Sequence, residues 1–159
     1  MLQGGINKVS PMTEPAATNS ALMTVAELEA FLERDFPQIH HGGRSFSVES
    51  AAHGHAMMRL AYHERHLRPG GTISGPSMFA LADLGLYVAV LASIGPVALA
   101  VTTNLTINFL NKPEPGDLLG EASLMKIGKR LAVGEVTIRR DGSDVIVAHA
   151  TGTYSIPPR

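Results

Sequence analysis

The chain has 159 residues, of which 45% are hydrophobic and 17% are charged, and its formal net charge at pH 7 is −1. This composition is typical of one globular domain with a buried core, and the scattered, nearly balanced charge argues against a nucleic-acid-binding protein, which would carry a basic face. The sequence contains no cysteine, which excludes disulfides, thiolate metal sites and cysteine nucleophiles.

The N-terminal segment is rich in Pro, Thr, Ser and Ala and has no periodic apolar pattern. We therefore expect residues 1–22 to be a disordered lead-in and residues 23–159 to form a single domain. The lead-in lacks the continuous apolar core of a secretory signal, so the expected setting is cytoplasmic. A short amphipathic helix should follow it, because Thr24 and Glu27 have the spacing of a capping box, and this helix should end before Pro37.

Two strands and a long helix are predicted next. The strands cover residues 44–52 and about 56–63. The run Ser74-Gly75-Pro76 is typical of a helix start, because serine can cap a helix and proline suits its first positions. The helix should cover about 76–94 and end at Gly95. Apolar residues surround it on every side, which indicates a helix buried in the core.

The remainder of the chain is strand-like, and Asp141-Gly142 within it is a strong signal for a two-residue hairpin. In the first of these strands, alternation predicts that Val101 and Leu105 share one face while Thr102 occupies the other. The strands cover residues 97–110, 117–127, 130–140 and 143–154. Helices do not alternate regularly with strands, which disfavours a parallel sheet. We predict an α+β fold in which a six-stranded antiparallel sheet wraps around one central helix.

Asp83 is the only charged side chain between Pro69 and Asn111. A buried, unpaired carboxylate is unfavourable, so Asp83 either pairs with a neighbour for structure or belongs to a functional site. The same argument disfavours a membrane-spanning role for the helix. Tyr87 lies on the same helical face as Asp83, and the helix start at Gly75 offers N–H groups and a partial positive charge suited to an oxyanion. The Asp83 carboxylate and the helix start at Gly75 together indicate a hydrolytic pair of a base and an oxyanion donor.

The run Gly70–Asp83, GGTISGPSMFALAD, resembles the signature of the hotdog-fold thioesterases of the phenylacetyl-CoA (PaaI-like) type. In those proteins His-Gly-Gly opens the central helix and Leu-Ala-Asp follows within it. Residues 103–110, TNLTINFL, and the following Pro113 resemble the next strand of that family. The similarity in element order extends from Phe46 to Tyr154.

This resemblance implies an acyl-CoA thioesterase acting on short- to medium-chain or aromatic acyl groups, with no cofactor besides the coenzyme A of its substrate. Asp83 matches the family's acidic residue, a general base or nucleophile, and Gly75 matches the glycine whose N–H polarises the carbonyl. Thr102 falls where some members place a hydroxyl that assists the water. The resemblance also implies a homodimer with sheets joined edge to edge, commonly doubled into a tetramer, with active sites at the subunit interface.

The sequence departs from the family pattern beside the proposed catalytic pair. Ser74-Gly75-Pro76 replaces His-Gly-Gly, so the Ser74 hydroxyl either substitutes for the histidine or leaves its hydrogen bond unmade, and Arg68 stands where some members have a water-orienting Asn. The basic hairpin around Gly128 is either solvated or meets the phosphates of coenzyme A. The predicted substrate-binding set comprises Ser74, Pro76, Arg68, Tyr87, Lys126, Lys129 and Arg130.

Two other functions remain open at this point. His53, His55 and His63 could form a metal site like that of a cupin, but the long apolar helix has no place in a cupin, and we predict no metal. A non-catalytic acyl-CoA-binding hotdog module would use the same pocket, and the loss of His-Gly-Gly is compatible with it. A hotdog dehydratase would carry a catalytic His near the helix, which has none.

Overall fold

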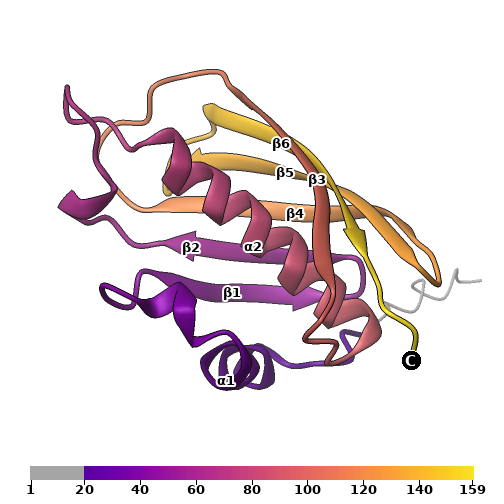
Figure 1. Ribbon diagram of the computed structural model, residues 1–159. Coiled ribbons are helices and arrows are strands. Elements are labelled where there is room, and N and C mark those ends of the chain that lie inside the picture. The colour runs from indigo at the N-terminus through magenta and orange to yellow at the C-terminus, as the bar shows by residue number, and fades with distance from the viewer. Residues whose placement is uncertain (1–19) are drawn as a thin grey trace, which may run out of the picture.

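A six-stranded sheet wraps around one long helix in the computed structural model, which describes residues 20–159. All neighbouring strands are antiparallel, in the order β1-β2-β4-β5-β6-β3, so β1 and β3 form the edges. Figure 1 shows α2 lying across one face of the sheet and α1 beside β1. The predicted α+β architecture is confirmed. The elements are α1 (Val25–Asp35), β1 (Phe46–Ala52), β2 (His55–Leu60), α2 (Gly75–Ile94), β3 (Val101–Phe109), β4 (Leu118–Ile127), β5 (Leu131–Arg140) and β6 (Ile146–Ser155), with short 3-10 turns at Pro37–His40 and Glu64–His66.

The packed part of the chain begins slightly before α1. Most of the predicted lead-in lies in residues 1–19, outside the described residues. The Leu22 N–H donates to the Ala92 carbonyl at 2.8 Å, and Met23 is buried. Thr24 and Glu27 form the predicted capping box, with both reciprocal hydrogen bonds present.

α1 protects the β1 edge of the sheet. Its buried residues Leu28, Phe31 and Leu32 pack into the core. A Glu29 carboxylate oxygen accepts a hydrogen bond from the Val48 N–H of β1. Because an unpaired edge N–H is a template for association with other chains, this contact closes part of one edge and leaves β3 at the other.

α2 forms the centre of the core. By length and composition it could cross a membrane, yet 72% of its most apolar window is buried within the domain. Its close approach to the sheet depends on glycines on the inner face of β5 and β6, because Gly134 and Gly152 are register partners beneath Leu86. A Cβ on Gly134 would lie 2.7 Å from the Ser123 carbonyl oxygen and 2.8 Å from Leu86 Cδ2.

Gly134→Ala is expected to lower the free energy of unfolding by about 1–3 kcal/mol, because a backbone oxygen cannot move away from the added methyl. The matched control is Gly85→Ala within α2, where a Cβ would meet Ala122 Cβ at an ordinary 3.5 Å. Replacing that helical glycine should stabilise the protein by about 0.5–1 kcal/mol. Urea unfolding of both variants measures this, and a stable Gly134→Ala variant would contradict the packing described.

Two features of the strands differ from the prediction. The pairing of β3 with β6 shifts register between Thr102 and Asn104, so one extra residue inverts the alternation. Val101 is consequently 57% exposed and does not share the inner face with Leu105. The predicted two-residue hairpin at Asp141-Gly142 is also wrong, because β5 ends at Arg140 and β6 begins only at Ile146. Asp141 and Gly142 still form the centre of a β-turn, in which the Ser143 N–H donates to the Arg140 carbonyl at 3.0 Å, but the strands do not continue directly from that turn. The Asp141 side chain contacts Arg59 of β2.

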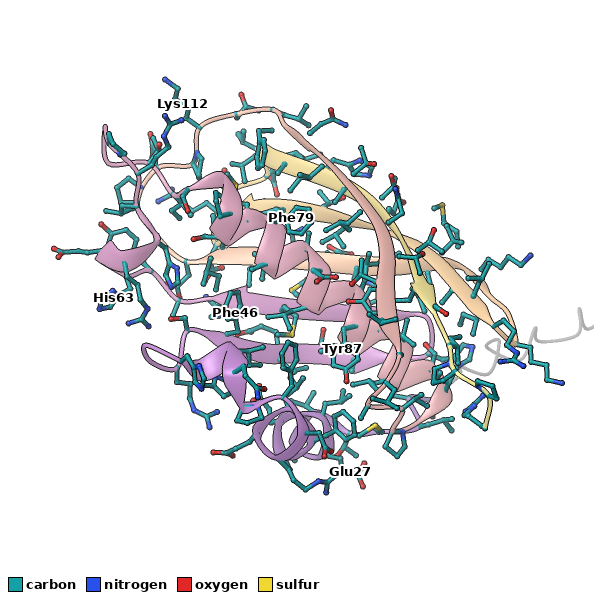
Figure 2. The ribbon with its side chains drawn as sticks, in the orientation of Figure 1. Glu27, Phe46, His63, Phe79, Tyr87 and Lys112 are labelled. Carbon is teal, nitrogen blue, oxygen red and sulfur yellow. The ribbon has the colours of Figure 1, made fainter. Side chains whose placement is uncertain are left out.

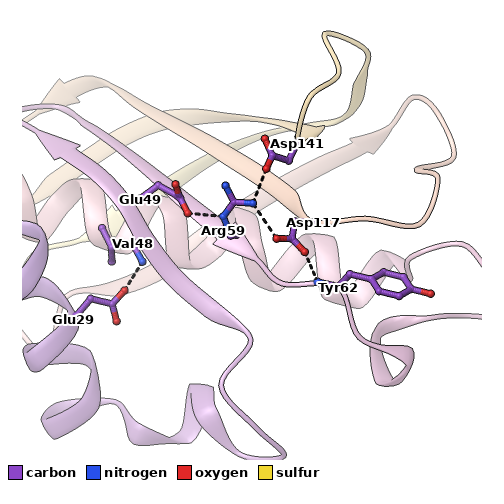
Figure 3. Close-up of polar contacts among 7 residues, drawn as sticks. All are labelled: Glu29, Val48, Glu49, Arg59, Tyr62, Asp117 and Asp141. Atoms are coloured by element: carbon purple, nitrogen blue, oxygen red, sulfur yellow. Dashed lines mark hydrogen bonds and ion pairs between the residues drawn. The ribbon is translucent and has the colours of Figure 1, made fainter.

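Arg59 joins three segments at one end of the sheet, as Figure 3 shows. Its guanidinium donates to Glu49 at 2.5 Å, to Asp117 at 2.9 Å and to Asp141 at 2.8 Å. Asp117 also accepts from the Tyr62 N–H at 2.8 Å. The hydrogen bond from Arg59, together with its positive charge, lowers the pKa of Asp141.

Arg59→Gln is expected to lower the melting temperature at pH 7, because it leaves three carboxylates without their shared cation. The folded pKa of Asp141 lies below its unfolded value, so its stabilisation is present above the unfolded pKa and is lost as pH falls through the folded one. The difference in melting temperature between Arg59→Gln and wild type should therefore become smaller below about pH 4. Circular dichroism melts from pH 3 to 8 test this, with Arg34→Gln as control, since among residues 20–159 the only ion pair of Arg34 is with its exposed neighbour Asp35. A loss independent of pH would contradict the electrostatic account.

Candidate active site

One face of α2 is left uncovered by the sheet. Pro76 and Phe79 are exposed, the latter by 39%, and Ala80 and Asp83 are partly exposed. The expectation that α2 is buried on every side is therefore wrong for this face, because the sheet curves around the other sides only. Figure 2 labels Phe79 toward one end of the helix and Tyr87 toward the other.

The Asp83 carboxylate is held through one of its two oxygens. The Thr102 hydroxyl donates to Oδ1 at 2.5 Å, and the Tyr154 hydroxyl lies 2.6 Å from the same oxygen. These two donors are register partners on β3 and β6. Within residues 20–159 no donor contacts Oδ2. One oxygen is thus fixed and the other is available to take a proton or to attack a carbonyl carbon.

Two stacked tyrosines support the carboxylate. The Tyr154 and Tyr87 rings stack with their centroids 6.0 Å apart, and the Tyr87 hydroxyl donates to the Ala98 carbonyl at 3.1 Å. Burial, and then the negative charge of Asp83, raise the pKa of Tyr154 well above its ordinary value. Burial likewise raises the pKa of Tyr87, followed by the charge of Asp35. Tyr154 therefore stays protonated and donates to Asp83 throughout the physiological pH range.

A cavity of about 250 Å³ opens at this carboxylate. Its wall is mixed, with apolar side chains and the hydroxyl groups that hold Asp83. This is the composition expected of a small-molecule site. The lining residues are Asp35, Phe36, Asp83, Tyr87, Ala98, Ala100, Val101, Thr102 and Tyr154.

The start of α2 presents one free backbone donor. Ser74 is the N-cap, and its hydroxyl accepts from the Ser77 N–H at 3.4 Å, while Pro76 has no N–H. The Gly75 N–H has no hydrogen-bond acceptor among the residues that the structure describes. As the first N–H of the helix it lies at the positive end of the helix dipole, the position expected of an oxyanion donor.

The surroundings of Gly75 are separate from those of Asp83. Gly75 and Arg68 line a cavity of about 370 Å³, together with Phe109 and the turn after it. Gly75, Pro76 and Phe79 also line an apolar hollow of about 450 Å³. Eight residues of helix separate Gly75 from Asp83, which corresponds to about 12 Å along its axis. One chain therefore does not bring the two predicted catalytic groups to a single carbonyl.

The basic hairpin also lines a different cavity from the carboxylate. Lys129 and Arg130 line a cavity of about 470 Å³ with the C-terminal residues Pro157, Pro158 and Arg159. Lys126 is exposed on the same hairpin and is not part of that lining. The seven predicted substrate-binding residues thus fall into three groups: Tyr87 with Asp83, then Ser74, Pro76 and Arg68 around Gly75, and the three hairpin cations.

The histidines of β2 and the loop after it serve local contacts. His55 Nε2 lies 3.2 Å from a Glu121 carboxylate oxygen, and His63 Nδ1 accepts from the Arg65 N–H at 3.1 Å. Across the described part of the chain, no three His, Asp or Glu side chains form a group that could hold a metal. The cupin alternative is wrong, because the sheet wraps around a central helix that a jelly roll does not contain.

Comparison with known proteins agrees with this architecture, which is the hotdog fold. A family model described as "Thioesterase superfamily" matches residues 70–147. A protein of Halobacterium salinarum named "putative esterase" is 34% identical over 129 residues, covering 73% of this chain and 85% of its own. The structure of a "putative thioesterase" from a Silicibacter species has 50% identity and a TM-score of 0.80, covering 89% of this chain and 97% of that one. A variant of the phenylacetic acid degradation protein PaaI from Thermus thermophilus has 24% identity and a TM-score of 0.63, covering 80% and 99% of the two chains.

The chain therefore belongs to the thioesterase superfamily, and it is a hydrolase of the hotdog fold. The family and fold predicted from the run Gly70–Asp83 are confirmed. Tyr154 was missed by the sequence argument. The sequence did indicate that Tyr154 points inward, because it ends a run of small inward residues, Ala148, Ala150 and Gly152, but it did not indicate the contact with Asp83.

Proposed function

We propose that this protein hydrolyses acyl-CoA thioesters that carry short- to medium-chain or aromatic acyl groups. The observation that carries the proposal is the Asp83 carboxylate, held at Oδ1 by Thr102 and Tyr154 and free at Oδ2. It lies at a cavity on the uncovered face of α2, where a substrate can approach. Thr102 acts by positioning the carboxylate, since its hydroxyl is already bonded to Asp83.

A second copy of the chain completes the proposed site. The two catalytic groups are about 12 Å apart on one helix, so a two-fold axis between antiparallel α2 helices would set the Gly75 N–H of one copy beside the Asp83 carboxylate of the other. The uncovered surface suits such a partner. Among residues 20–159 no strand pairs with the outer edge of β3, and Phe79, Val101 and Phe109 are 39%, 57% and 53% exposed. We propose a homodimer joined along β3, assembled further as a dimer of dimers.

The proposed reaction is a general-base hydrolysis. Asp83 Oδ2 takes a proton from water, and the water oxygen attacks the thioester carbonyl carbon. The Gly75 N–H stabilises the negative charge on the carbonyl oxygen. The tetrahedral intermediate then expels the coenzyme A thiolate, which receives the proton held by Asp83. In the nucleophilic variant Asp83 Oδ2 attacks the carbonyl carbon, and the C–S bond breaks to release the coenzyme A thiolate. Water then hydrolyses the resulting mixed anhydride, which restores the Asp83 carboxylate, and a proton from that water protonates the thiolate.

The outlying cations are proposed to bind the coenzyme A portion. Lys129 and Arg130 line a cavity wide enough for phosphate groups, and Lys126 lies on the same hairpin. None of the three forms an ion pair among residues 20–159. Charge-assisted hydrogen bonds from such side chains to phosphate oxygens are strong. Arg68 beside Gly75 is placed to contact the substrate near its thioester.

A non-catalytic acyl-CoA-binding module is the second candidate, because Pro76 leaves a single N–H donor at the helix start. A panel of acyl-CoAs incubated with the purified protein separates the two functions. A thiol reagent reports the released coenzyme A, and the cysteine-free chain adds no background. We expect catalytic thiol release from at least one short, medium or aromatic acyl-CoA. Saturable binding with no release above the uncatalysed rate would support the binding module and contradict the thioesterase proposal.

A further inference from the structure

A chain of hydrogen bonds runs from Arg65 to the cap of α2. Arg65 donates to the Ser45 hydroxyl, which lies 3.1 Å from His66 Nε2. His66 Nδ1 lies 3.2 Å from the Ser77 hydroxyl, which lies 2.9 Å from the Ser74 hydroxyl. The chain is partly buried throughout, and it ends one residue before Gly75.

The burial of Ser45 indicates a direction for this chain of hydrogen bonds. A guanidinium can only donate, so Ser45 accepts from Arg65. Ser45 is only 5% exposed, and within residues 20–159 His66 Nε2 is the one acceptor in contact with its hydroxyl, so the Ser45 hydrogen goes to that nitrogen. A neutral imidazole that accepts at Nε2 carries its hydrogen on Nδ1, and His66 therefore donates to Ser77.

Ser77 connects His66 to Ser74, the N-cap of α2. Its hydroxyl hydrogen goes to Ser74, because His66 Nδ1 carries its own hydrogen and cannot accept another. Ser74 accepts from both the hydroxyl and the N–H of Ser77. Among the hydroxyl and ring hydrogens of this hydrogen-bond chain, only the Ser74 hydroxyl hydrogen then has no assigned acceptor. Ser74 is the residue next to Gly75, whose N–H is free.

We propose that His66 is a positioning residue that, through Ser77, orients the Ser74 hydroxyl as a second hydrogen-bond donor to the thioester oxygen. The proposal rests on the proposed hydrolysis at Asp83 and Gly75, and it assigns roles to His66, Ser77 and Ser45. It explains how the protein supplies two donors to the thioester oxygen, the Gly75 N–H and the Ser74 hydroxyl, although Pro76 removes an N–H from the helix start.

The surroundings of His66 are consistent with a neutral ring. Burial, followed by the positive charges of Arg65 and His63, lowers the pKa of His66. Phe46 packs against its ring with 6.4 Å between the ring centroids. Neither ring nitrogen contacts a carboxylate within the described residues, so nothing there favours the imidazolium.

The ring tautomer tests the proposal without any need for turnover. In nitrogen-15 NMR of the imidazole groups, with His66→Phe used for assignment, we expect the His66 hydrogen on Nδ1 near pH 7. A hydrogen on Nε2 would reverse the chain and overturn the proposal. Because this readout does not depend on activity, its failure is distinct from a failure of the thioesterase function, which the acyl-CoA panel reports.

A double-mutant cycle tests the catalytic role. His66→Phe and Ser74→Ala should each lower kcat by about tenfold and leave KM nearly unchanged, and the double variant should be no slower than Ser74→Ala alone. His66→Asn should recover most of the loss, because its amide N–H can replace Nδ1. His53→Phe, an exposed position in the turn between β1 and β2, is the control with unchanged kcat. Losses that multiply in the double variant, or full activity of His66→Phe, would show that His66 does not act through Ser74.

Discussion

Asp83→Asn is expected to lower kcat for acyl-CoA hydrolysis by about 10³-fold, because an amide can neither take a proton from water nor attack a carbonyl carbon. The substitution keeps the size of the side chain, and the amide oxygen can still accept from Thr102 and Tyr154, which now bond to Oδ1. Thiol release at saturating substrate measures the effect, and a thermal melt verifies that the variant is folded.

Thr102→Val is the matched control for this prediction. It removes one hydrogen bond to Asp83 and preserves the shape of the side chain. Since Tyr154 still holds the carboxylate, we expect a loss of only about tenfold. An Asp83→Asn variant with more than a tenth of wild-type kcat, or one no slower than Thr102→Val, would remove Asp83 from the catalytic role.

Gly75→Pro is expected to lower kcat by about 10²-fold, because it deletes the N–H that would stabilise the oxyanion. The backbone tolerates proline here, since Gly75 is the first helical residue and Ser74 before it has an extended conformation with ψ of 152°. The added carbon would approach the Phe109 ring, where a Cβ lies 3.2 Å from the nearest atom. The same assay measures the effect.

Gly75→Ala separates the lost donor from crowding, because it adds the same Cβ and keeps the N–H. We expect Gly75→Ala to change KM through the contact with Phe109 and to retain most of kcat. Equal losses of kcat in the alanine and proline variants would mean that Gly75 acts only by leaving room for the ligand.

The proposed catalytic pair could be found in the sequence because its signals are local. Asp83 stands out as a lone charge in an apolar helix, and Gly75 next to Pro76 marks the helix start. The support of the carboxylate was only partly predictable. Tyr154 reaches Asp83 because β6 pairs with β3, a contact between residues 71 positions apart that no spacing rule reveals.

The prediction of inward and outward residues from alternation was wrong in β3, where the backbone is irregular. Strict period-two alternation assigns Val101 to the inner face, and the extra residue between Thr102 and Asn104 reverses that assignment. Thr102 thereby faces Asp83. The separation of Gly75 from Asp83 follows from helix geometry alone, but the partner that would close it lies beyond the pattern of a single chain.

Hybrid dimers test most directly whether Asp83 and Gly75 of two copies act on one thioester. Asp83→Asn and Gly75→Pro chains, co-expressed with different affinity tags and purified as the mixed dimer, would contain one site with both groups intact and one with neither. We expect the hybrid to recover about half of wild-type kcat per dimer, whereas each parent homodimer stays nearly inactive. A hybrid no more active than its parents would contradict a site shared between two subunits.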